Sequence, residues 1–214
     1  MIFSSIEFII FFIFFLLALK FLDKFQRNLI IIFSLLFYAF WNISFVLLIL
    51  YFCAATYIFI KKNNYLKTSI FLIILPLIYF KYSIFLLDIL NLNQFNSFAY
   101  DGEIPLAISF ITFTAIAAII DTKNRIFDKN SINFYSISEF ILFFPQLIAG
   151  PILRLNELIP QLKNKCVFKK ENVKFGLILF SIGFVKKIFF ADNIGIFIDP
   201  IFENPETYSN DMIF

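Results

Sequence analysis

The sequence predicts an all-α membrane protein: a polytopic transmembrane helical fold with re-entrant segments broken by Pro and Gly. Composition is the first reason, because 61% of the 214 residues are hydrophobic, 21% are aromatic and only 15% are charged. A soluble domain of this length needs a far more polar surface. The second reason is that long apolar runs alternate with short charged loops. We therefore expect one membrane domain over residues 1–214, surrounded by the lipid bilayer.

The first apolar run covers residues 2–22. At about 1.5 Å per residue it is long enough to cross roughly 30 Å of hydrocarbon. Glu7 lies near its start, and Lys20, Lys24 and Arg27 lie at its end or beyond it. This order of charges is the reverse of a secretory signal peptide, so we expect a retained anchor.

Residues 29–60 form a run too long for one upright span. Trp41 and Asn42 lie in its middle, and Trp favours the interface between membrane and water. We therefore expect two tight spans joined near Trp41. This hairpin would place the basic loops 20–27 and 61–67 on one side, which the positive-inside rule makes cytoplasmic.

The next predicted span, residues 68–90, is interrupted by Pro76 and Lys81. The loop that follows, residues 91–103, has two acidic residues and no basic one, so we expect it outside the cell. Residues 104–120 would then return to the cytoplasmic side. The alternation predicts a multi-pass chain with its N-terminus outside.

Residues 143–161 read FFPQLIAGPILRLNELIPQ, which combines the hydrophobicity of a membrane segment with the residues of a loop. Each Pro removes a backbone hydrogen bond, and hydrocarbon offers no water to replace it. We therefore expect a buried, broken, re-entrant element whose two ends both lie on the cytoplasmic side. Its breaking and polar residues are Pro145, Gln146, Gly150, Pro151, Arg154, Glu157, Pro160 and Gln161.

Charged residues beside apolar runs are candidates for function, because an ionisable group in hydrocarbon usually faces a cavity or a partner. Lys81 has either such a role or lies at a span boundary. Asp121 marks a helix end or contributes to a site, and Arg154 either pairs with Glu157 on the cytoplasmic surface or contributes to a site.

Two short apolar runs, residues 175–185 and 188–198, are each too short for a span and resemble half-helices or interfacial segments. Lys186 and Lys187 lie between the runs, and Asp192 lies within the second. The two lysines either place positive charge beside an anionic cofactor or lipid phosphate, or extend to the interface.

The residues alone do not identify an enzyme. The chain has no His, the usual general base near neutral pH. It shows no catalytic Ser, His and Asp arrangement and no Gly-rich phosphate loop. Cys53 and Cys166 suggest neither a disulfide framework nor a metal site. The net charge of +3 is too small to indicate a nucleic-acid partner.

Three stretches resemble the membrane-bound O-acyltransferase (MBOAT) family, in particular its bacterial branch that acetylates alginate and peptidoglycan. They are IPLAISFITFTAIAAIIDTKNR at 104–125, FFPQLIAGPILR at 143–154 with Pro160 and Gln161, and GLILFSIGFVKKIFFADNI at 176–194. The resemblance covers essentially the whole chain. Members are longer, and the His regarded as catalytic lies beyond the part that matches residue 214, so we expect the N-terminal half of such a domain.

Some positions depart from the family pattern. Ala107 stands where the family has Gly, and Thr114 stands where Gln is usual. Ala118 and Lys123 replace Tyr, and Asn124 replaces Arg. These differences concern the detailed role of the 104–125 motif.

The resemblance implies a bacterial inner-membrane protein of cell-envelope biosynthesis. In a complete member, acetyl-CoA would be the acyl donor, reached from the cytoplasm, and an extracytoplasmic acetyltransferase partner would modify a cell-surface glycan. No catalytic residue and no bound cofactor are expected in this chain by itself. Arg154, Lys186 and Lys187 would contact the donor. The expected tunnel or motif residues are Lys81, Asp121, Pro145, Gln146, Gly150, Pro151, Gln161 and Asp192.

Three functions remain open from the sequence. The first is a portion of an acyltransferase that cannot perform the transfer alone. The second is a truncated product without catalytic activity. The third is a transporter or flippase, which would also use broken helices and intramembrane lysines.

Overall fold

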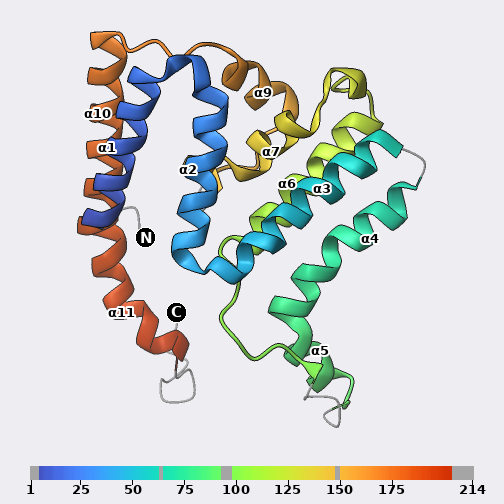
Figure 1. The fold of residues 1–214 in the computed structure, drawn as a ribbon. Coiled ribbons are helices and arrows are strands. Elements are labelled where there is room, and N and C mark those ends of the chain that lie inside the picture. The colour runs from blue at the N-terminus through green and yellow to red at the C-terminus, as the bar shows by residue number, and fades with distance from the viewer. Residues whose placement is uncertain (1–4, 63–64, 93–97, 148–149, 204–214) are drawn as a thin grey trace. The chain divides into compact units, whose positions relative to one another are not determined.

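The computed structural model describes residues 5–62, 65–92, 98–147 and 150–203, and every regular element in these ranges is helical (Figure 1). This confirms the all-α prediction. The α-helices are α1 Ile6–Phe21, α2 Gln26–Trp41, α3 Val46–Lys62, α4 Leu66–Leu77, α5 Ser83–Ile89, α6 Ile108–Lys123, α7 Phe134–Leu142, α8 Phe144–Leu147, α9 Leu155–Lys163, α10 Lys170–Val185 and α11 Asp192–Glu203. Two π-helical turns, η3 Ile78–Tyr82 and η6 Lys186–Ala191, interrupt the regular geometry.

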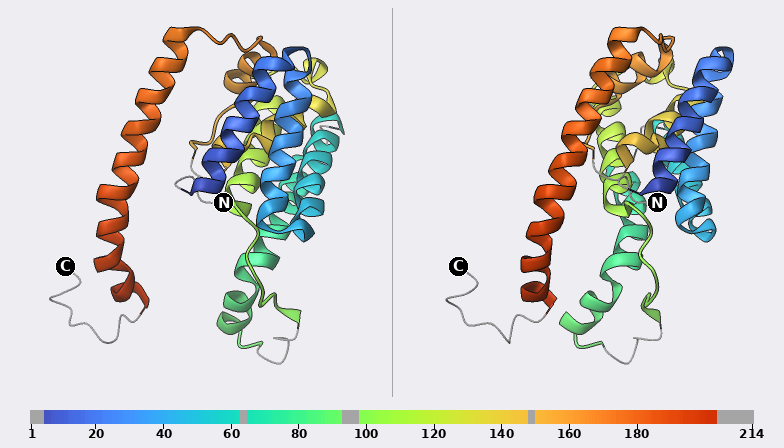
Figure 2. Two further views of the ribbon diagram at one scale, coloured as in Figure 1. Left: turned by 60° about the vertical axis from the view of Figure 1, so that its left-hand side comes forward. Right: turned by 90° about the vertical axis from the view of Figure 1, so that its left-hand side faces the viewer.

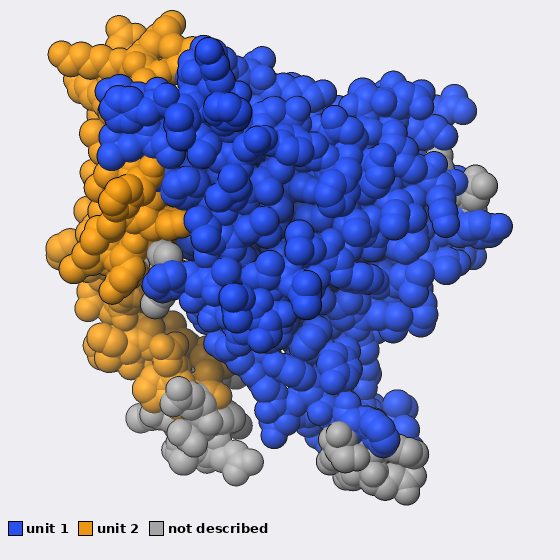
Figure 3. All heavy atoms as spheres, viewed as in Figure 1, with its two compact units in different colours: residues 1, 15–166 blue, residues 2–14, 167–214 orange. Residues whose placement is uncertain are grey.

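The chain divides into two compact units (Figure 3). The first contains residues 15–166, and the second contains residues 2–14 and 167–214. The helix α1, the described part of the predicted first span, is divided between them. Its 16 residues correspond to a length of about 24 Å.

The predicted break at Trp41 is confirmed. The helix α2 ends at Trp41, and Asn42 takes an extended conformation with φ −158°. The Asn42 side chain accepts a hydrogen bond from the Ser44 backbone N–H at 2.9 Å, which starts the short 3₁₀ turn before α3. Figure 1 shows that the start of α2 and the end of α3 lie in the upper half of the view, as expected for a hairpin.

The core of the first unit forms where α3 packs against α4, α6 and α7, and where α2 packs against α7 and α8. The Tyr38 side chain is fully buried, and its hydroxyl donates to the Leu106 carbonyl at 3.1 Å. The Phe144 ring lies 5.0 Å from the Phe15 ring and 5.4 Å from the Phe37 ring, measured between centroids. Large aromatic side chains thereby attach the short α8 to the hairpin.

The predicted interruption at Pro76 is wrong, because Pro76 lies inside α4 and the helix continues through η3 into α5. A Pro removes one backbone donor and crowds the preceding turn, but α4 continues past Pro76 to Leu77, and the π turn η3 begins only at Ile78. Segments Ile43–Lys62 and Leu66–Ile89, of 20 and 24 residues, are the two described helical segments long and apolar enough to cross a membrane.

In the second unit, the two short apolar runs at 175–185 and 188–198 belong to one continuous helical stretch and are not separate segments. The elements α10, η6 and α11 follow one another without a gap, and both views of Figure 2 show a single rod. No Pro occurs between Lys170 and Ala191, so nothing ends the helix there. The surfaces of α10 and η6 contain no buried residue.

Candidate functional site

The predicted break in residues 143–161 is confirmed, whereas the element is only partly buried, because Pro145 and Pro151 are exposed. The helix α7 is buried from Ser136 to its end, α8 has only four residues, and residues 150–154 are not helical before α9 begins. Residues 148 and 149 lie outside the part that the structure describes. Pro145 is the second residue of α8, where a missing N–H costs little.

Pro160, which the sequence placed among the breaking residues, does not break the chain, because α9 continues through Pro160 and Gln161 to Lys163. The Gln161 side-chain amide donates to the Glu157 carbonyl at 2.9 Å. This hydrogen bond lies beside Pro160, which has no backbone N–H to donate within α9. Gln161 therefore supports α9 and is exposed on its surface.

A small cleft of about 20 Å³ lies between the broken element and α6, which is room for one water molecule. The Gln146 amide nitrogen donates to the Pro151 carbonyl at 2.7 Å. The other end of the amide, Oε1, is buried and has no donor among the described residues. The cleft is lined by Phe110, Ile111, Thr114, Phe140, Ile141, Phe143, Gln146, Leu147, Gly150 and Pro151.

Position 150 has no room for a side chain, because Gln146 lies against it. A Cβ at position 150 would lie 2.8 Å from the Gln146 carbonyl oxygen and would also collide with the Gln146 side chain. The Gln146 side chain therefore folds over position 150, and its amide is held by Pro151. The predicted motif residues Gln146, Gly150 and Pro151 thus form one local arrangement.

Asp121 and Arg154 are brought together, although 104–125 and 143–154 are separate motifs. Asp121 lies in the last turn of α6 and is 5% exposed. The Arg154 Nη1 atom lies 3.6 Å from Asp121 Oδ1, and the Arg154 side chain is 56% exposed. Asp121 Oδ2 has no hydrogen-bond donor among the described residues.

Glu157 does not pair with the Arg154 guanidinium, as one alternative from the sequence proposed. Its Oε2 accepts instead from the Arg154 backbone N–H at 3.1 Å. This bond satisfies a free donor at the start of α9. The Arg154 guanidinium therefore pairs with Asp121 and not with Glu157.

Lys81 lies in the π turn η3 and is exposed. Its Nζ atom lies 3.5 Å from Ser109 Oγ and 5.6 Å from the centre of the Tyr82 ring. The contact with Ser109 connects the middle of the predicted span 68–90 with the start of α6.

Lys186, Lys187 and Asp192 belong to the second unit. Lys187 and Asp192 form an ion pair across the π turn η6. A π-helix has i→i+5 geometry, which brings these two residues, five positions apart, onto one face. The Lys187 charge is thus partnered within its own helix.

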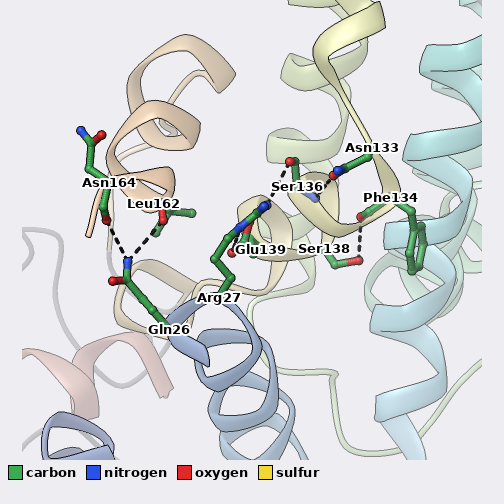
Figure 4. Close-up of polar contacts among 9 residues, drawn as sticks. All are labelled: Gln26, Arg27, Asn133, Phe134, Ser136, Ser138, Glu139, Leu162 and Asn164. Atoms are coloured by element: carbon green, nitrogen blue, oxygen red, sulfur yellow. Dashed lines mark hydrogen bonds and ion pairs between the residues drawn. The ribbon is translucent and has the colours of Figure 1, made fainter. Parts of the chain in front are cut away.

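Arg27 and the buried Glu139 form an ion pair that the sequence interpretation missed (Figure 4). The Arg27 Nε atom donates to both Glu139 oxygens, at 2.8 and 2.9 Å, and Nη2 donates to Ser136 Oγ at 3.2 Å. The guanidinium also lies 4.8 Å from the centre of the Tyr135 ring. Only 2% of the Glu139 side chain is exposed. An acid alone in an apolar segment was the available signal, because such a group needs a partner.

Neighbouring contacts attach the end of α9 to the start of α2. The Gln26 side-chain amide donates to the carbonyls of Leu162 and Asn164, at 3.3 and 3.0 Å (Figure 4), and its oxygen accepts from the Cys166 N–H at 2.7 Å. Lys165 forms an ion pair with Asp23 at 2.5 Å. The hydrogen bond from Lys165 holds the pKa of the Asp23 carboxyl below its ordinary value.

Comparison with known proteins agrees with the motifs. Residues 122–214 match the model of the membrane-bound O-acyltransferase family. The chain is 33% identical to the peptidoglycan O-acetyltransferase of Helicobacter pylori, in an alignment that covers 86% of this chain and 42% of that protein. The probable alginate O-acetylases AlgI of Pseudomonas aeruginosa and Pseudomonas putida are 32% and 31% identical, each over 97% of this chain.

The chain belongs to the membrane-bound O-acyltransferase family. It is therefore a membrane protein. It spans less than half the length of these relatives, with 43% and 46% of the two AlgI proteins covered. No solved structure matches the chain.

The MBOAT motif at 104–125 has unusual backbone at both ends of α6. Ala107 precedes the helix with φ 55°, in the left-handed region. This conformation favours Gly, which is the residue of the family pattern at this position. Arg125, with φ 59°, follows the helix, and the Ile126 N–H donates back to the Asp121 carbonyl at 2.9 Å. That bond is typical of a Schellman motif, which also usually contains Gly.

Proposed function

We propose that this chain forms the N-terminal portion of a membrane O-acyltransferase that uses acetyl-CoA to acetylate a cell-surface glycan. The observation that carries the proposal is the broken element that brings Arg154 to the buried carboxylate of Asp121. The names of the relatives support an O-acetyltransferase. The alternation of apolar runs and basic loops supports a multi-pass arrangement in the bacterial inner membrane with the N-terminus outside.

The proposed reaction requires a tunnel that is lined by protein. The acyl donor is polar and highly charged, so it does not cross hydrocarbon unaided. Non-helical backbone is tolerated at membrane depth where it is buried in protein or lines a cavity. In the proposal, residues 145–154 form part of this wall, and Arg154 contacts the donor at its cytoplasmic mouth. An extracytoplasmic acetyltransferase then modifies the glycan.

The chain does not provide a histidine for general base catalysis. We therefore expect no acetyl transfer by the 214 residues alone. The transfer would require a longer polypeptide or a second one that supplies a base.

The test replaces Arg154 by Ala in a version extended to include a histidine-bearing second half. We expect about tenfold weaker donor binding and a similar loss of acetylation, because a charge-assisted contact is removed. Lys163→Ala is the matched control, since Lys163 is an exposed basic residue on the same helix and outside the cleft. Acetylation and donor binding of Arg154→Ala at the wild-type level, with normal expression, would reject the proposal.

Two other functions are tested by separate measurements. A non-catalytic product predicts that no downstream reading frame encodes further spans and a His. A transporter or flippase predicts substrate flux in vesicles without acyl transfer.

A further inference from the structure

The end of α6 fixes the position of Asp121. The Asp121 backbone carbonyl accepts a hydrogen bond from the Ile126 N–H, and Arg125 takes the left-handed conformation that this turn requires. The carboxylate is thereby held in the interior, with only 7% of the side chain exposed. A buried carboxylate is unfavourable unless a cation or hydrogen-bond donors compensate it.

The compensation in this structure is incomplete. The distance of 3.6 Å between Arg154 Nη1 and Asp121 Oδ1 exceeds the 2.7–2.9 Å typical of a charge-assisted hydrogen bond. Asp121 Oδ2 has no donor within the described part of the chain. A guanidinium has five N–H donors, and Asp121 contacts one edge of it, while 56% of the Arg154 side chain remains exposed.

We propose that Asp121 is a positioning residue that holds one edge of the Arg154 guanidinium, so that its other donors face a phosphate group of the acyl donor. The inference rests on the proposed function and adds a specific pair of residues to it. An unanchored Arg loses its rotamer freedom when it binds a ligand. An Arg already held by Asp121 loses less, which strengthens binding.

The backbone of Arg154 is held as well. Glu157 accepts from its N–H, so the N-terminal end of α9 and the guanidinium are fixed by different acids. This separation allows the two roles to be tested independently. Asp121→Asn removes the charge that faces the guanidinium, whereas Glu157→Ala removes the acceptor of the Arg154 N–H at the start of α9.

The experiment measures the dissociation constant of coenzyme A for the 214-residue chain in lipid nanodiscs. Pantetheine, which has no phosphate, is the second probe. We expect Asp121→Asn to weaken coenzyme A binding about tenfold and to leave pantetheine binding unchanged, while Asp121→Glu restores most of the affinity. Arg154→Lys should show a similar loss, because an ammonium lacks the planar fork that both Asp121 and phosphate use.

Glu139→Gln is the matched control. It weakens another buried ion pair, so it should lower the thermal stability without changing the coenzyme A dissociation constant. A loss of affinity in Glu139→Gln as large as that in Asp121→Asn would assign the effect to stability and overturn the inference.

Other outcomes are also decisive. Coenzyme A binding by Asp121→Asn that equals or exceeds that of the wild type overturns the positioning role and leaves the proposed function standing. Should Asp121→Asn fail to fold, the exposed Arg154→Lys decides, and an unchanged affinity overturns the inference. A wild-type chain that does not bind coenzyme A overturns both this inference and the donor contact in the proposed function.

Discussion

At the residue scale, a left-handed alanine stands at the start of α6. Ala107 has φ 55°, and a Cβ in this region costs roughly 1–2 kcal/mol. We expect Ala107→Gly to raise the free energy of unfolding by about 0.5–1 kcal/mol, since the greater chain entropy of Gly offsets part of the gain. Denaturant titration in one detergent measures the change.

Ala117→Gly is the control for this prediction. Ala117 lies inside α6, where Gly is destabilising by about 1 kcal/mol. The two Ala-to-Gly changes should therefore have opposite signs. Equal destabilisation by both would contradict the strain at Ala107.

Gly-to-Ala substitution should have opposite effects on stability at Gly150 and at Gly176. Gly150→Ala places a Cβ 2.8 Å from the Gln146 carbonyl oxygen, and we expect a loss of about 1–3 kcal/mol from overpacking. Gly176→Ala in α10 meets no atom within 4 Å and should stabilise its helix by about 0.5–1 kcal/mol. The midpoints of thermal unfolding of both variants provide the comparison.

The sequence predicted the breaks at Pro145, Gly150 and Pro151, although not the continuation of helices through Pro76 and Pro160, and it did not predict which charges meet. Pro145, Gly150 and Pro151 constrain the backbone locally, so their effect is visible in the sequence. The pairing of Asp121 with Arg154 depends on how α6 and α9 pack, and no local pattern contains that information. The conformation of Ala107 was also not foreseen, because Ala does not favour it.

At the element scale, the Arg27–Glu139 pair attaches α7 to the start of α2. Removing one partner of a fully buried pair costs about 3–5 kcal/mol. Arg27 is one-third exposed, so we expect a smaller loss of about 2–3 kcal/mol from either Arg27→Met or Glu139→Leu alone.

A double-mutant cycle tests this role. The double variant removes both charges, so no uncompensated carboxylate remains in the interior. Its destabilisation should be smaller than the sum of the two single losses by about 1–2 kcal/mol. Additive losses in a denaturant titration would mean that the pair contributes no coupling.

Helix ends and π turns differ in how well the sequence predicts them. The break after Trp41 was predicted, because Trp and Asn interrupt a long apolar run there and Asn42 caps the next turn. The π turns at Ile78–Tyr82 and Lys186–Ala191 were not predicted. A π turn adds one residue to a turn without needing Gly or Pro, so it leaves no breaking residue in the sequence. The lysines that looked like interruptions lie within these turns and continue the helices.

At the scale of the whole molecule, the basic loops of the first unit provide a test of membrane orientation. Gln26 and Asp23 contact residues 162–166, so the loops after α1 and α9 lie side by side. This agrees with the prediction that both face the cytoplasm. Arg27 counts less toward the positive-inside rule than the sequence suggested, because Glu139 neutralises it.

The two cysteines make the orientation measurable. Cys53 is buried and Cys166 is exposed, so Cys53→Ser leaves one accessible thiol. Partial desolvation raises the pKa of the Cys166 thiol. The thiolate fraction that reacts is therefore lower at neutral pH, and labelling is best done near pH 8.5.

We expect a membrane-impermeant maleimide to label Cys166 in inverted vesicles or permeabilised cells, but not in intact spheroplasts. The control is Asp101→Cys in a background without the two natural cysteines. Asp101 is exposed in the loop predicted to lie outside, so this thiol should react in intact spheroplasts. Labelling of Cys166 from outside, or of both positions from the same side, would contradict the alternation of spans.

The positive-inside rule concerns the basic residues near span ends. Replacing Lys163, Lys169 and Lys170 together by Glu should therefore increase the fraction of molecules in which Cys166 is labelled from outside.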